Sequence, residues 1–430
     1  MAENSAKVGD YVEIHLSKII YEGILLETPG NEKGVVLLKL DSGYNIGFNK
    51  KDILKIKFLR KVKILGNEIE IKKSREKPNI AMIITGGTIA SKYDAKTGGV
   101  TNLINAQELF RFYPEMFEKV NVAKIEIPFM KSSEDMDFKD WQKIGKIAEK
   151  LLNDGNISGI IVTHGTDFLH YTASALSFFL RNLNKPVVLT YSQRSSDRAS
   201  SDANLNLQCA AQAAISDIAE VMIVGHANSD DDFCLAMRGT KTRKMHTSRR
   251  DAFKMINAKP IARIFRDRIE IISEYNRRQK TKTKYDGKFE SLVATIKIYP
   301  GQNPDILDYY LKKKYKGLIL ETSGLGHVPT KGKNSWMKKL KEIQKKGIVV
   351  CAVSQCINGR VDPFVYSNAR ELFESGVIYL EDMLSETALV KLGWVLGHDS
   401  WRKTKGEIKE KMLHNFAGEL NNRMEEDSNY

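Results

Sequence analysis

The sequence has little of what marks membrane-bound and secreted proteins. Its 430 residues contain only four cysteines, too few for a disulfide scaffold in a chain of this length. No apolar run reaches the about 18 residues of a membrane span. The first residues, MAENSAKVGD, are polar and lack the apolar centre of a signal peptide. We therefore expect a reduced, cytoplasmic protein that does not associate with membranes.

Nucleotide and metal signatures are also missing. The phosphate-loop pattern G-x-x-x-x-G-K-[ST] is absent, and no G-x-G-x-x-G follows the apolar run at 80–84. Cys351 and Cys356 have four residues between them, but no second pair or nearby histidine completes a zinc pattern. We expect no metal and no cofactor in this chain.

Acidic residues are in deficit. The chain has 53 Asp and Glu against 67 Lys and Arg, a formal net charge of +14. Such an excess favours a polyanionic partner, and nucleic acid is the first candidate. A lysine-rich proteome produces the same excess without any such partner, so charge alone leaves both interpretations open.

The chain divides into three parts by pattern. Residues 1–77 hold short runs rich in Val, Ile, Tyr and Phe between turn signals, which predicts a small SH3-like β-barrel. Residues 78–280 and 290–430 alternate buried-strand patterns with helical ones, which predicts a two-lobed α/β core with parallel sheets. The expected strands lie at 80–84, 157–162, 186–190, 221–225, 317–320 and 348–353. The polar segment 276–288 is interpreted as a linker or exposed loop.

Hydroxyl-bearing turns follow two of these strands. TGGTIA, with Thr85 and Thr88, follows the first, and THGTD, with Thr166 and Asp167, follows 157–162. Functional groups gather at the carboxyl edge of a parallel sheet. A competing interpretation makes Thr166 and Asp167 an ordinary N-cap of the following helix.

A threonine nucleophile needs a base. The stretch 238–254 supplies Lys241, Lys244 and His246, and like charge can depress the pKa of a lysine there. His164 follows a buried strand and is interpreted as satisfying a backbone hydrogen bond.

IITGGTIAS and VTHGTD resemble the two signatures of the L-asparaginase/glutaminase family, and the similarity runs from about residue 80 to about 400. The resemblance implies hydrolysis of a side-chain amide through an acyl-enzyme. It assigns Thr88 as the usual nucleophile, Thr166 and Asp167 as the second threonine and its aspartate, and Lys244 as the lysine. It also implies that Ser133, Glu134, Asp167 and Gly87 bind substrate, with Tyr93 as the candidate lid tyrosine.

The barrel in front of such a core resembles the D subunits of archaeal glutamyl-tRNA(Gln) amidotransferases, and this resemblance covers nearly the whole chain. It implies a glutaminase that supplies ammonia to an E subunit, which uses ATP and Mg²⁺ to amidate Glu-tRNA(Gln). It also implies a homodimer of this chain within a heterotetramer.

Two alternatives stay open. One is a stand-alone cytosolic L-asparaginase with an accessory barrel. The other is a catalytically inactive RNA- or protein-binding module, whose best support is a run of barrel cations that alternates with the expected core residues Ile53, Leu54, Ile56 and Phe58. The cations of that run are Lys50, Lys51, Lys55, Lys57, Arg60, Lys61 and Lys63. The sequence also leaves open whether Thr88 or Thr166 is the nucleophile, and whether Gln or Asn is preferred.

Overall fold

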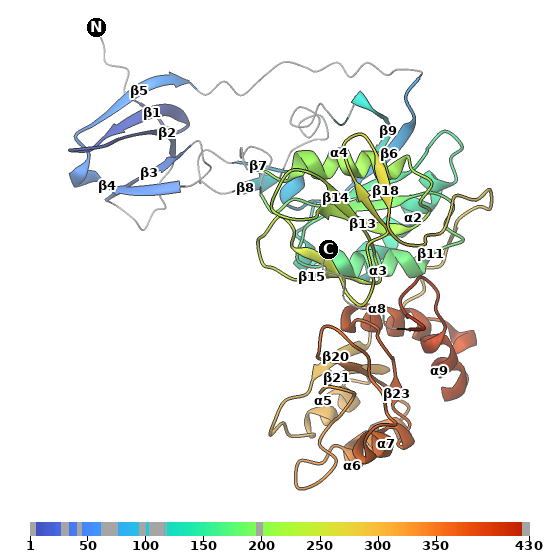
Figure 1. Ribbon diagram of the computed structural model, residues 1–430. Coiled ribbons are helices and arrows are strands. Elements are labelled where there is room, and N and C mark those ends of the chain that lie inside the picture. Colours follow the sequence, from blue (N-terminus) through green and yellow to red (C-terminus); the bar gives the residue numbers. More distant parts are fainter. Residues whose placement is uncertain are drawn as a thin grey trace.

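The computed structural model describes residues 6–26, 34–40, 45–61, 76–93, 100–102, 116, 118–194 and 201–423. It consists of an N-terminal β domain, a large α/β lobe and a smaller C-terminal α/β lobe, as Figure 1 shows from blue to red. The predicted two-lobed α/β core behind a small β domain is confirmed.

The N-terminal domain is a five-stranded antiparallel sheet in the order β4-β3-β2-β1-β5. Its strands are β1 (Asp10–His15), β2 (Ile20–Leu26), β3 (Val35–Lys39), β4 (Asn45–Asn49) and β5 (Lys55–Lys61), with the short helix η1 (Lys50–Asp52) before β5. Val12, Ile14 and Leu38 form the centre of its core. The prediction that Leu54 belongs to that core is wrong, because its side chain is 72% exposed before β5 begins. Lys63 lies outside the described residues.

The large lobe is built on an eight-stranded mixed sheet, in the order β18-β17-β14-β13-β12-β10-β6-β9. The expected parallel strands form its centre, as β6 (Asn79–Ile84), β10 (Ile160–Thr163), β12 (Val187–Thr190) and β13 (Val221–His226), together with β9 (Asn121–Glu126). The sheet is not parallel throughout, because three further strands are antiparallel. These are β14 (Cys234–Arg238), β17 (Ala262–Ile264) and β18 (Ile269–Ile271).

Helices cover both faces of this sheet. α4 (Ala203–Ala214) packs on the face that carries Met82 and Val188, and α2 (Phe138–Leu152) and α3 (Leu169–Phe179) cover the face that carries Ile83 and Val162. The smaller elements are η2 (Thr88–Ala90), β7 (Ser91–Tyr93), β8 (Val100–Asn102), η4 (Ser133–Asp135), β11 (Leu180–Arg181), β15 (Thr242–Lys244), β16 (Phe253–Met255) and β19 (Lys284–Tyr285).

The C-terminal lobe is a four-stranded parallel sheet in the order β20-β21-β22-β23. The strands are β20 (Val293–Lys297), β21 (Gly317–Thr322), β22 (Val349–Ser354) and β23 (Ile378–Tyr379). The helices are α5 (Ile306–Lys312), α6 (Met337–Lys345), α7 (Ser367–Glu374), α8 (Ser385–Leu396), η5 (Asp399–Trp401) and α9 (Lys405–Leu413). β21 and β22 confirm the two strands expected here.

The two lobes share a core. Phe178 and Phe179 of α3 pack with Trp394 of α8 and with the adjoining face of the small sheet. Two ion pairs are also buried there, between Lys241 and Asp382 and between Lys391 and Glu419, each with Nζ 2.6 Å from a carboxylate oxygen and no exposed side-chain surface. The aromatic contacts and the Lys241–Asp382 pair join the C-terminal lobe to the large lobe, whereas the Lys391–Glu419 pair lies within the C-terminal part.

The basic segment 276–288 joins the lobes but is not simply an exposed loop. The guanidinium of Arg278 donates to the carbonyls of Ser158 and Ser216, at 2.7 and 2.6 Å. Thr283 is buried, and β19 pairs with β11. The segment is therefore packed along the large lobe.

Within the described ranges, no helix combines the length and the apolar character needed to cross a bilayer. Cys351 is buried in β22, and Cys356 is exposed beyond its end.

Candidate active site

The first hydroxyl-bearing turn leaves β6 at the carboxyl edge of the large sheet. Thr85 is buried, and its Oγ1 donates to the carbonyl of Thr163 at 2.8 Å. Gly86 and Gly87 follow with φ of +117° and +83°, a region that favours glycine. Thr85 therefore holds the two strand ends together, and Thr88 is half-buried at the start of η2.

The diglycine lets this turn touch the second one. A Cβ built on Gly87 would lie 2.4 Å from the backbone nitrogen of Gly165, and one on Gly86 would lie 2.5 Å from the carbonyl oxygen of Lys131. Real Cβ contacts are essentially never that short. The TGG and HGT turns, 78 residues apart in sequence, are thus in direct backbone contact.

His164, at the start of the second turn, is structural. Its Nδ1 is 2.7 Å from the carbonyl of Gly165 and therefore donates, which leaves Nε2 to accept from Thr172 Oγ1 at 2.9 Å. Complete burial lowers the pKa of His164 to about 4, so the ring is neutral at pH 7. The interpretation of His164 as a residue that satisfies a backbone hydrogen bond is confirmed.

The hairpin of β15 and β16 brings Lys244 to the second turn. Lys244 Nζ donates to Thr166 Oγ1 at 2.8 Å and to Asp167 Oδ1 at 2.7 Å. The lysine side chain is 10% exposed and that of Asp167 is 61% exposed. Three residues that the sequence placed in one site, across 77 and 78 positions, therefore touch.

The N-cap interpretation of Thr166 and Asp167 is wrong. α3 begins after Phe168, which has no side-chain cap of its own, and the Phe168 amide donates to Ser133 Oγ at 3.3 Å. Thr166 and Asp167 use their oxygens on Lys244 instead. Their side-chain oxygens therefore accept hydrogen bonds from Lys244 and do not cap the N-terminus of α3.

Ser133 lies behind the second turn. It is buried in η4, and a Cβ on Gly165 would lie 3.1 Å from Ser133 Oγ. Ser133 Oγ also donates weakly to Glu134 Oε2, at 3.5 Å, and Glu134 is exposed. Ser133 and Glu134 therefore border the same turn as Thr166, where a substrate-binding segment was predicted.

Lys131 anchors that segment. Its amide donates to the carbonyl of Thr85 at 2.9 Å, and its Nζ donates to Asp140 in the first turn of α2 at 2.8 Å. The hydrogen bond that Lys131 donates to the Asp140 carboxylate raises the pKa of the Lys131 ammonium. The segment 131–134 is thus tied to both hydroxyl-bearing turns.

The C-terminal lobe adds a neighbouring cluster that the sequence did not indicate. Glu386 of α8 lies 3.3 Å from Arg243 Nε and 4.0 Å from His170 Nε2. Burial raises the pKa of Glu386 and lowers that of His170 to about 3, and positive charge on Arg243 and Lys244 lowers the His170 value further. No spacing rule links these residues, because Glu386 comes from the other lobe.

Two further residues singled out in the sequence, Tyr93 and His246, have no contact with the candidate site among the interactions that the structure describes. The backbone of Tyr93 ends β7, opposite Val100 of β8, but its side chain lies outside what the structure describes. His246 accepts at Nδ1 from the amides of Ser248 and Arg249, both at 3.0 Å, which makes it part of a turn.

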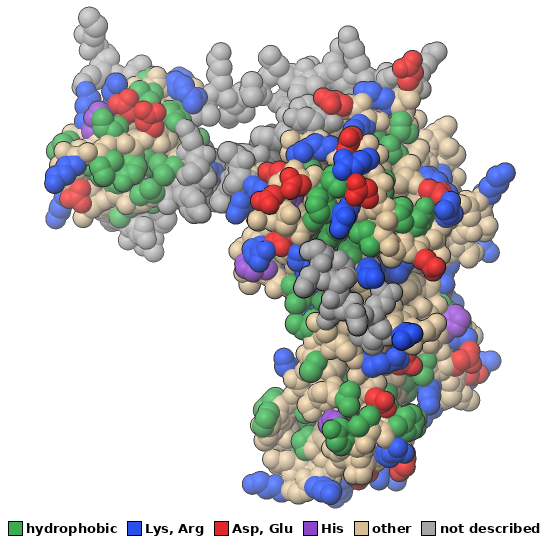
Figure 2. Space-filling view, in the orientation of Figure 1, with side chains coloured by type: hydrophobic (Ala, Val, Ile, Leu, Met, Phe, Trp, Pro, Cys, Tyr) green, Lys and Arg blue, Asp and Glu red, His purple; other side chains and the backbone are tan. Residues whose placement is uncertain are grey.

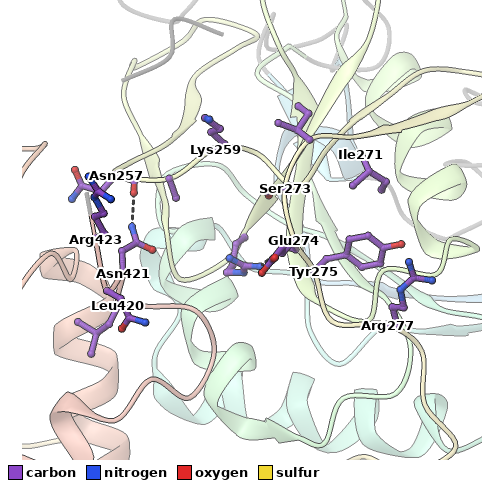
Figure 3. Close-up of a pocket in the computed structure, with 14 residues that line it drawn as sticks. Asn257, Lys259, Ile271, Ser273, Glu274, Tyr275, Arg277, Leu420, Asn421 and Arg423 are labelled. Atoms are coloured by element: carbon purple, nitrogen blue, oxygen red, sulfur yellow. Dashed lines mark hydrogen bonds between the residues drawn. The ribbon is translucent and has the colours of Figure 1, made fainter. Parts of the chain in front are cut away.

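A wide hollow elsewhere on the large lobe contains none of the predicted site residues. It lies between β18, the start of the segment that joins the lobes, and residues 420–423, and the close-up shows Lys259, Tyr275 and Arg423 around it (Figure 3). The Asn421 side-chain amide donates to the carbonyl of Asn257 at its edge. The candidate active site is therefore defined by the contacts among Thr166, Asp167 and Lys244, and not by this hollow.

The fold and this set of contacts define a class of protein, the L-asparaginases and glutaminases. The family model "Asparaginase, N-terminal" matches residues 79–277, and "Glutaminase/Asparaginase C-terminal domain" matches 292–412. Among solved structures, the thermostable L-asparaginase from Thermococcus kodakarensis aligns with a TM-score of 0.70 and 30% identity, over 80% of this chain and 100% of its own. L-asparaginase I from Vibrio cholerae aligns with a TM-score of 0.67 and 29% identity, over 80% and 99%.

The N-terminal domain shows which group within this class the chain belongs to. The model "GatD N-terminal domain" matches residues 6–59. The glutamyl-tRNA(Gln) amidotransferase D subunit of Pyrococcus furiosus is 46% identical over 430 residues, covering 98% of this chain and 96% of the relative, and that of Thermococcus kodakarensis is 44% identical over the same shares. The chain belongs to the family of glutamyl-tRNA(Gln) amidotransferase D subunits.

Proposed function

We propose that this chain hydrolyses the side-chain amide of glutamine and supplies the ammonia to a partner that amidates Glu-tRNA(Gln). The observation that carries the proposal is the pair of hydrogen bonds from Lys244 Nζ to Thr166 and Asp167, at 2.8 and 2.7 Å, beside a turn that presents Thr88. A hydroxyl, a base and a carboxylate that orients the base are the parts of an activated nucleophile.

Thr88 is the proposed nucleophile. Its Oγ attacks the carboxamide carbon while its proton passes through Thr166 Oγ1 to a neutral Lys244, whose remaining N–H bonds Asp167. The developing oxyanion is held by backbone amides near Gly87–Thr88 and Gly165–Thr166. The C–N bond then breaks as the leaving nitrogen takes the proton, and ammonia departs. Water cleaves the Thr88 ester and releases glutamate.

Thr166 is the alternative nucleophile, because Lys244 contacts its oxygen directly. The two assignments share every residue and differ only in which oxygen carries the acyl group. Trapping that intermediate therefore separates them.

The substrate's α-amino and α-carboxylate groups are assigned to the polar groups bordering the second turn. Asp167, 61% exposed, and the exposed Glu134 offer carboxylates to an ammonium group. Ser133 and Gly87 are assigned to the carboxylate.

The partner assignment is part of the same proposal. The matched relatives are named as the D subunits of glutamyl-tRNA(Gln) amidotransferases. We assign ATP and Mg²⁺ to an E subunit, and we assign this chain to a homodimer within a heterotetramer in the cytoplasm.

A stand-alone L-asparaginase is the second candidate function. It is supported by the solved asparaginases, because 100% and 99% of their own length aligns with this chain. The alignment covers only 80% of this chain. It leaves residues 6–59, which match the GatD N-terminal model, without a role.

The catalytic assignment is tested with Thr88→Ala, Thr166→Ala and Lys244→Met in the assembled complex, with glutamine-dependent ammonia release as the readout. Each variant is expected to lose several orders of magnitude, equivalent to about 4 kcal/mol or more of transition-state stabilisation. Thr404→Ala is a matched control, because Thr404 only caps α9 and its loss costs about 1 kcal/mol of stability.

Mass spectrometry of acid-quenched enzyme with glutamine should find the glutamyl ester on the peptide that contains Thr88. An ester on the Thr166 peptide would exchange the two roles. Retention of more than a tenth of the activity by Thr88→Ala would refute the nucleophile assignment.

A further inference from the structure

The outer face of the C-terminal lobe carries an unusual concentration of lysine. Residues 301–347 hold eleven lysines and four carboxylates, a net charge of +7, which is half of the +14 of the whole chain. Ten of these lysines are exposed and lie on or beside α5 and α6, and we call them the α5–α6 face. They are Lys312, Lys313, Lys314, Lys316, Lys331, Lys333, Lys338, Lys341, Lys345 and Lys346.

The charge of this face is almost uncompensated. The eleventh lysine, Lys339, forms ion pairs with both nearby aspartates, with its Nζ 3.4 Å from Asp305 and 2.6 Å from Asp308. In the part of the chain that the structure describes, none of the ten lysines forms an ion pair. Glu342 is the remaining exposed carboxylate on α6. The face therefore presents a dense positive field to solvent.

Helix stability does not explain the pattern. Cations are favourable at a helix C-terminus, which accounts for Lys312 and Lys345. α6 has no acidic residue in its first turn, and Lys338 lies in that turn. Positive charge there opposes the helix dipole, so Lys338 costs helix stability.

The lysines are also held outward. The inner sides of α5 and α6 are buried against the sheet through Leu307, Leu340 and Ile343. α8 occupies the opposite face of the sheet, next to the large lobe, so the α5–α6 face is turned away from it (Figure 1). Basic side chains lie along this end of the lobe in Figure 2.

Two exposed aromatic rings accompany the lysines. Tyr309, 54% exposed, lies one turn before Lys312 on α5, and Tyr299, 56% exposed, precedes the helix. The side-chain amide of Asn334 donates to the carbonyl of Gly301 at 3.5 Å, which ties the loop of Lys331 and Lys333 to the turn that follows Tyr299. The loop of Lys331 and Lys333 therefore lies beside the turn that follows Tyr299, and Tyr309 lies on the same helix as Lys312.

We propose that the α5–α6 face binds the phosphate backbone of an RNA, with Tyr299 and Tyr309 stacking on its unpaired bases. Protein–nucleic acid interfaces are strongly positive, whereas lysine is depleted from the centres of protein–protein interfaces. Exposed aromatic rings interleaved with cations are what single-stranded segments stack on. The choice of a tRNA as the probe rests on the proposed function, but the binding itself requires no amide hydrolysis.

The test compares two fourfold variants of the full chain, each losing four positive charges. One changes the α5–α6 face (Lys331→Gln, Lys333→Gln, Lys338→Gln, Lys341→Gln). The matched control changes the basic segment that joins the lobes (Lys280→Gln, Lys282→Gln, Lys284→Gln, Lys288→Gln). Binding of a labelled tRNA(Gln) transcript is followed by fluorescence anisotropy between about 50 and 200 mM salt.

The face variant should bind at least about tenfold more weakly, and its slope of log K against log salt should fall by about 3, because each phosphate contact contributes roughly 0.7 to 0.9 to that slope. The control should change less than about threefold in affinity. Equal losses in both variants, or wild-type binding by the face variant, would overturn the proposal. Displacement of the RNA by poly-glutamate at equal charge concentration would overturn it in favour of an acidic protein partner.

Two single variants test the rings. Tyr309→Leu should weaken binding of a transcript with unpaired loops several-fold, while Tyr309→Phe, which keeps the ring, should not; equal effects would refute the stacking contact. Glutamine hydrolysis is measured in parallel and should be unchanged in the face variant. A wild-type chain that binds RNA, but releases no ammonia from glutamine even with the partner protein and Glu-tRNA(Gln) present, would remove the proposed function and leave the RNA site standing.

Discussion

Gly87→Ala is the most informative single substitution at the candidate active site, because it changes no catalytic side chain. At φ +83° an alanine adopts a conformation that costs about 1–2 kcal/mol relative to glycine. Its Cβ would lie 2.4 Å from the Gly165 nitrogen and 2.5 Å from the Gly165 Cα, where ordinary contact begins at 3.4 Å. Both obstacles are backbone atoms, so no side-chain rotation relieves the overlap.

The two turns must therefore separate by about 1 Å, and misplacement of catalytic groups by that distance costs about 100-fold in rate. We expect kcat for glutamine-dependent ammonia release to fall by about this factor, with Thr88 moved away from Thr166 and Lys244. Overpacking adds about 1–3 kcal/mol to the backbone strain, so the total loss of stability is about 2–5 kcal/mol, and the thermal melt shows whether the variant is folded under the assay conditions.

The assay couples ammonia release to glutamate dehydrogenase, beside a thermal melt of the same sample. Gly155→Ala is the matched control, because no atom lies within 4 Å of a Cβ at that glycine. It should keep wild-type turnover. If Gly87→Ala retained half of the wild-type kcat, the contact between the two turns would not position the nucleophile, and the reasoning would be wrong.

Two further predictions concern stability. Asp382→Ala leaves the buried ammonium of Lys241 without its carboxylate and should destabilise the fold by about 3–5 kcal/mol in denaturant unfolding. The double variant Lys241→Met with Asp382→Leu should recover most of that loss. Equal stability of the single and double variants would contradict this. Because burial lowers the pKa of His170 from 6.5 to about 3, the unfolded chain binds the proton more readily, and stability is lost as the pH falls below about 6.5. His170→Phe should therefore show a smaller drop in melting temperature between pH 7 and pH 5 than the wild type, with a difference of about 2 kcal/mol at pH 5, and an identical drop would refute the assignment.

Much of the architecture could be predicted from local pattern. The six apolar runs became six strands because each is short and buried, and buried parallel strands need no alternation to be recognised. The sequence did not predict β14, β17 and β18, because the region around them is dominated by charged and turn-forming residues. These strands are recognised only by their pairing, β14 with β13 and β17, and β17 with β18. Leu54 was misassigned because alternation predicts which residues share a face but not where a strand begins.

In the candidate site, too, some residues were predictable from local sequence and others were brought there by contacts distant in sequence. The hydroxyl-bearing turns were predictable because parallel strands end at one edge. Lys241 and Lys244 are three residues apart, and residue type alone does not separate them. The structure places Lys241 in a buried pair with Asp382 and Lys244 on Thr166. Glu386 reaches the neighbourhood of Arg243 only because the C-terminal lobe packs there.

Release of ammonia from glutamine for a tRNA-dependent partner is tested most simply by measuring ammonia release from glutamine and from asparagine, each with and without the partner protein and Glu-tRNA(Gln). We expect weak or no glutamine hydrolysis by the isolated chain. The partner and Glu-tRNA(Gln) should strongly stimulate the glutamine reaction. Robust asparagine hydrolysis by the isolated chain, unchanged by either addition, would contradict it.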